Sequence, residues 1–88
     1  MPRLRRIRDG AGDSGSRVEA IRWREDGRVD EIVGHMPTVG CSLLVGSITA
    51  RSYASQDYWL TTVVEEILEE RDGYVRFRTT NSEYEFTY

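Results

Sequence analysis

The chain has 88 residues, of which 39% are hydrophobic and 31% are charged, and its net charge is −3. This length predicts one domain with a small core, and so much hydrophobic sequence excludes a disordered chain. The acidic balance argues against non-specific binding to nucleic acid, which requires a basic surface. The longest apolar run covers only residues 43–45, so we expect neither a membrane span nor a secretory signal. A single cysteine fits a reducing compartment, and we expect a cytoplasmic protein.

All twelve basic residues are arginine, for which codon usage is the simplest explanation. Four of them lie within residues 3–8, and a loop rich in glycine and serine follows at residues 9–16. We therefore expect residues 1–16 to form a basic arm with a flexible loop, and residues 17–88 to form a single small β domain. Such an arm could reach the glutamates of residues 65–72 in a second copy, which predicts a homo-oligomer.

The first hairpin signal is Asp26-Gly27, because both residues tolerate a positive φ. A two-residue turn at this place pairs Arg22 with Glu31 and Ile21 with Ile32. Opposite charges and apolar side chains then meet their complements, which supports this register.

The centre of the chain also has the alternation typical of a strand. We expect one apolar side there, formed by Val39, Cys41, Leu43 and Val45. A bend at Gly46-Ser47 precedes a second extended segment over residues 48–53. The alternation predicts a buried, inert thiol for Cys41 and leaves His35 in a loop.

Residues 62–71 fit two structures. Apolar residues recur at helical spacing through Leu60, Val64, Ile67 and Leu68, with glutamates between them, which indicates a short amphipathic helix. The same segment is rich in β-branched residues, and a bulge would explain the broken alternation of a strand. We favour the strand and keep the helix as the alternative.

The last fifteen residues alternate cleanly between apolar and polar side chains, which predicts a hairpin with one buried face. With Asn81-Ser82 as the turn, Phe77 would face Phe86 and Thr79 would face Tyr84.

Two strings in this half of the chain resemble a known pattern. They are Trp59-x-Thr61-Thr62-x-Val64-x-x-Ile67 and Phe77-x-Thr79-x-Asn81-Ser82-x-Tyr84, which resemble short uncharacterised proteins of bacteriophages and prophages. The resemblance covers residues 30–88 and implies a small, SH3-like antiparallel β-barrel or sheet. It carries over no catalytic residue, and it implies a protein that acts in the cytoplasm of a bacterial host.

Catalytic and metal-binding constellations are absent from the sequence. His35 and Cys41 are the only soft ligands, which is too few for a zinc site, and no nucleophile has a base and an orienting acid at a recognised spacing. There is no phosphate-binding glycine loop of a known type. We expect no enzyme activity and no cofactor.

The segment that best suits a ligand lies between residues 51 and 61. Its aromatic side chains can stack on a base, while its arginine, amide, carboxylate and hydroxyl groups can bind polar edges or a phosphate. The candidate ligand-binding residues are Arg51, Tyr53, Gln56, Asp57, Trp59 and Thr61. The alternative is structural: Trp59 and Tyr53 close a small core, and Asp57 caps a turn.

These patterns predict a non-enzymatic binding protein. We expect a phage-type anti-defence protein that sequesters a small anionic, nucleotide-like ligand or occludes a host defence protein. The alternative is a module that binds single-stranded nucleic acid, or a regulatory adaptor.

Overall fold

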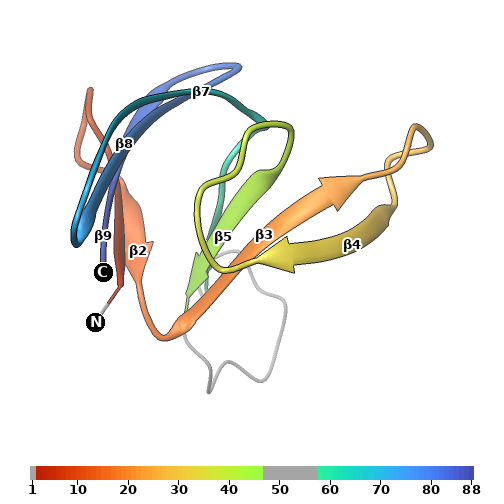
Figure 1. Cartoon of the computed structure of the whole chain (residues 1–88), viewed down its shortest axis with the longest axis horizontal. Coiled ribbons are helices and arrows are strands. Elements are labelled where there is room, and N and C mark those ends of the chain that lie inside the picture. Colours follow the sequence, from red (N-terminus) through yellow and green to blue (C-terminus); the bar gives the residue numbers. More distant parts are fainter. Residues whose placement is uncertain (1, 47–57) are drawn as a thin grey trace.

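The computed structural model describes residues 2–46 and 58–88, and these residues form β-strands and connecting turns with no helix. Two antiparallel sheets result (Figure 1), so the predicted mostly-β class is confirmed. The strands are β1 (Arg3–Arg6), β2 (Gly12–Ser14), β3 (Arg17–Trp23), β4 (Val29–Gly34), β5 (Ser42–Gly46), β6 (Tyr58–Leu60), β7 (Val64–Arg71), β8 (Tyr74–Thr79) and β9 (Glu83–Thr87).

The hydrophobic core lies between the inner faces of these two sheets. One sheet has the strand order β2-β1-β9-β8-β7, and the other has the order β4-β3-β5-β6. Alternate residues of β8 and β9 meet alternate residues of β3 and β5, as expected for strands with one buried face. The core cluster consists of Leu4, Val18, Leu43, Val45, Val64, Val75, Phe77, Tyr84 and Phe86.

Residues 64–71 form strand β7, so the favoured strand is confirmed and the helical alternative is wrong. The strand pairs with β8 and contains two register shifts, one before Glu66 and one before Glu69. Each shift adds one residue to the two-residue period, so that Val64 and Ile67 both pair with inward-facing residues of β8. A strand with two bulges therefore reproduces the three-residue spacing that indicates a helix.

The basic arm expected at the N-terminus is wrong for Arg3–Arg6, because these residues form β1 between β2 and β9. Leu4 is 1% exposed and belongs to the core, so burying this single apolar residue anchors the arginine-rich segment. β2 approaches so closely that a Cβ at Gly12 would lie 2.0 Å from the carbonyl oxygen of Leu4. Glycine is thus the residue that fits at this position of β2.

The C-terminal hairpin is confirmed, but its predicted register is wrong by two residues. Phe77 pairs with Tyr84, and Val75 pairs with Phe86. The turn lies one residue earlier than expected, since Thr79 and Ser82 close it: the N–H of Thr79 donates to the carbonyl of Ser82 at 2.7 Å. The N–H of Ser82 donates in return to the Thr79 hydroxyl at 3.2 Å. A shift of two residues keeps each side chain on its predicted face.

The first hairpin has the predicted pairs, Ile21 with Ile32 and Arg22 with Glu31. β4 contains two register shifts, and the one between the Arg22 and Trp23 pairs leaves Asp30 as an extra residue. Both Asp30 and Glu31 form ion pairs with Arg22.

The predicted central strand is right only in part. β5 is buried on both faces rather than one, and Cys41 is buried as expected. Val39 is 57% exposed in the turn before the strand, so it does not share the apolar side. The predicted second segment, residues 48–53, lies outside the described residues.

The outer face of the five-stranded sheet is a ladder of opposite charges. Arg5, Glu85, Arg76 and Glu69 are successive cross-strand partners over β1, β9, β8 and β7. The end pairs lie at 2.6 Å (Arg5 to Glu85) and 4.0 Å (Arg76 to Glu69). Glu65, Glu66 and Glu69 of β7 are thus paired to arginines of the same chain, and Arg5 is held in β1. The arm that was expected to exchange between copies does not exist in this form.

Candidate ligand-binding site

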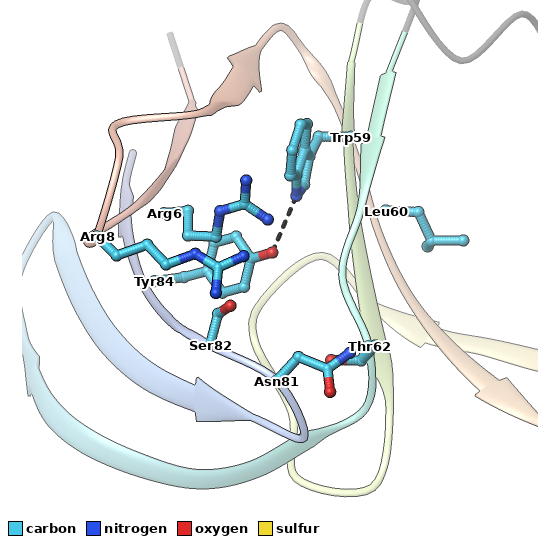
Figure 2. Close-up of a pocket in the computed structure, with 8 residues that line it drawn as sticks. All are labelled: Arg6, Arg8, Trp59, Leu60, Thr62, Asn81, Ser82 and Tyr84. Carbon is cyan, nitrogen blue, oxygen red and sulfur yellow. Dashed lines mark hydrogen bonds between the residues drawn. The ribbon is translucent and has the colours of Figure 1, made fainter.

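A solvent-open hollow of about 460 Å³ lies at one end of the core, where β6 of one sheet faces β1 and β9 of the other (Figure 2). Its walls come from three separate parts of the chain. The lining residues are Arg6, Arg8, Trp59, Leu60, Thr62, Asn81, Ser82 and Tyr84.

Trp59 and Tyr84 form the aromatic wall of the hollow. Trp59 pairs with Val45 of the core, so its indole points inward, and its Nε1–H donates to the Tyr84 hydroxyl oxygen at 3.1 Å. The Tyr84 ring is itself buried and stacks on Phe77 with ring centres 5.6 Å apart. The hydrogen bond satisfies the indole N–H and fixes the orientation of the two rings across the gap between the sheets.

Arg6 lies over the Trp59 ring, with its guanidinium carbon 5.0 Å from the ring centre. The carboxylate of Asp9 accepts two hydrogen bonds from this guanidinium, at 3.0 Å from Nε and 2.6 Å from Nη2. These bonds raise the pKa of Arg6. Hydrogen bonds from Arg6 and from the backbone N–H of Ala11 lower the pKa of Asp9 to about 2. Arg6 is therefore a positioned cation that already has a carboxylate partner.

Arg8 extends into the same space from the turn after β1 (Figure 2), and it makes no ion pair with another described residue. Asn81 and Ser82, in the turn before β9, supply an amide and a hydroxyl on the opposite side, and Thr62 adds a second hydroxyl. The site thus combines one guanidinium without an ion-pair partner among the described residues, one guanidinium held by Asp9, an aromatic wall and hydrogen-bonding groups.

Only some of the residues predicted to bind a ligand can be placed. Trp59 lines the hollow and packs against the core cluster, so the ligand-binding and structural interpretations are both compatible with its position. Thr61 is 4% exposed and does not line the hollow. Its hydroxyl accepts the N–H of Leu43 at 3.0 Å and donates to the carbonyl of Thr62 at 2.7 Å. The other four candidates, Arg51, Tyr53, Gln56 and Asp57, lie outside the described residues.

Sequence reasoning missed the two arginines of this site, and it assigned Tyr84 to the core alone and Asn81-Ser82 to a turn. One signal was present: Leu4 and Arg6 are two residues apart in an extended run, so they share a strand face. The face that buries Leu4 therefore also points Arg6 inward, toward the rim of the core.

Metal binding and membrane insertion were also considered for the part of the chain that the structure describes. No group of three His, Cys, Asp or Glu side chains could hold a metal ion there. His35 Nδ1 is 2.8 Å from the carbonyl oxygen of Val18. The described residues also contain no helix with the length and apolar character needed to cross a membrane.

Comparisons of this chain with family models, with curated proteins and with solved structures found no match. The geometry of the hollow is therefore the feature from which a function can be inferred.

Proposed function

We propose that this protein is a non-enzymatic binding protein whose hollow holds a small ligand with an anionic group beside a planar ring, as a nucleotide has. One observation carries the proposal: the guanidinium groups of Arg6 and Arg8 converge on the space beside the Trp59 indole (Figure 2).

The chemistry of each wall supports this ligand class. Arginine binds phosphate and carboxylate through a planar fork of donors, and Arg8 has no ion-pair partner among the described residues. A flat ring can stack on the indole or on the guanidinium of Arg6, as bases do on proteins that bind them. The amide of Asn81 can bond a polar ring edge. A volume of about 460 Å³ is in the range of small-molecule sites, roughly 300–1,000 Å³.

The biological role that fits is sequestration. Among the described residues, those that line the hollow offer binding groups and include no His, Asp or Glu that could activate a hydroxyl. An anti-defence protein of the phage type would use such a hollow to remove a nucleotide signal in the host cytoplasm. Occlusion of a host protein is the alternative target, in which Trp59 and Arg8 would act as anchoring side chains.

Isothermal titration calorimetry against purine and pyrimidine mononucleotides tests the proposal. We expect Arg8→Ala to weaken binding by roughly 10- to 150-fold, which corresponds to about 1.5–3 kcal/mol for a charge-assisted hydrogen bond. Arg24→Ala is the matched control: Arg24 is exposed at the tip of the first hairpin and does not line the hollow, so its loss should leave the affinity unchanged.

Three results would overturn the small-ligand proposal. Binding of single-stranded oligonucleotides with a steep salt dependence, and of no mononucleotide, would favour a nucleic-acid module. No heat with either class would leave a host protein as the target. An equal loss of affinity in the Arg8 and Arg24 variants would show that binding is electrostatic and not specific to the hollow.

A further inference from the structure

Asp9 fixes the position of one of the two arginines of the hollow. Its carboxylate accepts hydrogen bonds from Nε and Nη2 of Arg6, at 3.0 Å and 2.6 Å. The backbone N–H of Ala11 donates to the same carboxylate at 3.1 Å, so the carboxylate is anchored to the turn after β1 as well as to the guanidinium. Because two parallel hydrogen bonds fix a guanidinium in both position and plane, Asp9 determines where the charged group of Arg6 lies.

The Arg6 guanidinium is held in this way against the Trp59 ring. Its central carbon lies 5.0 Å from the ring centre, within the range of a cation–π contact. The edge formed by Nε and Nη2 is one of the two edges with which a guanidinium can bind a phosphate, and Asp9 occupies it. Arg6 therefore provides the hollow with a flat charged surface beside the indole, and its charge is already paired.

Arg8 is the cation that remains for an anionic group. It extends into the hollow (Figure 2) and forms no ion pair with another described residue. The pKa of Asp9 is lowered to about 2 by its hydrogen bonds with Arg6 and Ala11 and, to a smaller degree, by the positive charge of Arg8. Asp9 is thus ionised at neutral pH and lies near enough to act on Arg8. Two cations and one anion together leave a single positive charge for a ligand.

The neighbouring carboxylates of β9 face away from the hollow. Glu83 and Glu85 alternate with Tyr84, whose ring is in the core, and both pair with arginines of the outer face. No Asp or Glu is among the described residues that line the hollow. In this part of the chain, Asp9 is therefore the carboxylate that can set which ligand charge the hollow accepts.

We infer that Asp9 is a specificity-determining residue, through which the hollow accepts a nucleotide with a singly charged phosphate diester in preference to one with a doubly charged monoester. The inference rests on the proposed function and names the class of phosphate. The charge of a diester is matched by Arg8. The second charge of a monoester meets no further unpaired cation among the described residues that line the hollow, and the Asp9 carboxylate repels it. The loss of water around that second charge is then not compensated.

Calorimetric titration with matched ligands tests the inference. At about pH 7.5, adenosine and cytidine 5′-monophosphates carry about two negative charges, since their second pKa is about 6. Their methyl phosphate esters have the same ring and sugar and carry one charge. Each methyl ester should bind the wild-type protein about 10-fold more tightly than its monophosphate. Asp9→Asn keeps a side-chain oxygen for the Ala11 N–H and removes the charge, so it should reduce this preference to about 2-fold or less, mainly through tighter binding of the monophosphate.

Asp26→Asn is the matched control. Asp26 is exposed in the turn between β3 and β4 and does not line the hollow, so the same change of charge there should keep the wild-type preference. A melting curve shows whether the Asp9 variant is folded. If it is not, Asp9→Ser, which also keeps an acceptor oxygen, takes its place.

The outcomes separate this inference from the proposed function. A wild-type protein that binds the monophosphates at least as tightly as the methyl esters overturns the inference. A folded Asp9 variant that keeps the wild-type preference also overturns it, as does an equal loss of preference in the Asp26 variant. In each of these cases a nucleotide still binds, so the proposed function stands. The absence of heat with all four ligands refutes the proposed function itself, and the inference falls with it.

Discussion

Removing the Phe77 side chain should destabilise the whole protein. Phe77 is 0% exposed at the centre of the core. It pairs with Ile67 of β7 and with Tyr84 of β9, and it stacks on the Tyr84 ring. Phe77→Ala loses the transfer free energy of the ring and leaves a cavity, which together cost about 3–5 kcal/mol. A chain of this length has a total free energy of unfolding of about 4–13 kcal/mol.

Urea unfolding followed by tryptophan fluorescence measures this loss. With a slope of about 1–2 kcal/mol per M, the unfolding midpoint of Phe77→Ala should fall by about 1.5–5 M. Tyr88→Ala is the control: Tyr88 also stacks on a core ring, that of Phe86, but it is 52% exposed. We expect a loss of no more than about 1 kcal/mol for this variant.

A midpoint for Phe77→Ala that lies as close to the wild type as that of Tyr88→Ala would refute the reasoning. It would mean that the packing of Phe77 between β7 and β9 contributes little to the free energy of unfolding. A changed slope with an unchanged midpoint would instead indicate a change in the denatured state.

Two further predictions concern hydrogen bonds near the site. Thr61→Val removes the acceptor of a buried N–H of β5 and should lower the free energy of unfolding in urea by about 1–3 kcal/mol. Thr61→Ser keeps the hydroxyl and should lower it clearly less. Equal losses would mean that the methyl group of Thr61 contributes to stability and its hydrogen bond does not. Asp9 has its pKa lowered from 3.8 to about 2 by Arg6, so its ion pair stabilises the fold above about pH 4 and the contribution is lost as the pH falls toward 2. The melting temperature of Asp9→Asn should therefore fall less than that of the wild type between about pH 5 and pH 2, and parallel curves would contradict the assignment.

The alternation of residues 75–88 by itself determined which side chains enter the core, because each strand residue is committed to one face. It did not determine which residue opposes which. A shift of two residues keeps Phe77 and Phe86 on the buried face and leaves the alternation of apolar and polar side chains unchanged. The mutual hydrogen bonds of Thr79 and Ser82 decide between the two registers. Faces follow from local periodicity, whereas register depends on contacts in the turn.

Residues 64–71 show the same division. Their spacing of three is compatible with a helix or with a strand that has two bulges, and only pairing with β8 selects the strand. The arginine-rich N-terminus resembles a solvated arm until Leu4 is seen to be buried against Phe86.

The candidate site was the least predictable feature, because its parts are far apart in the sequence. Trp59 was identified because the segment between residues 51 and 61 combines aromatic and polar side chains. Arg6 and Tyr84 become its neighbours only when β1 pairs with β9 and the two sheets close over the core. The sequence determined that the chain is a small β protein whose C-terminal hairpin has one buried face. The tertiary structure decided which cations meet which aromatic ring, since that meeting depends on strand order, which local patterns do not encode.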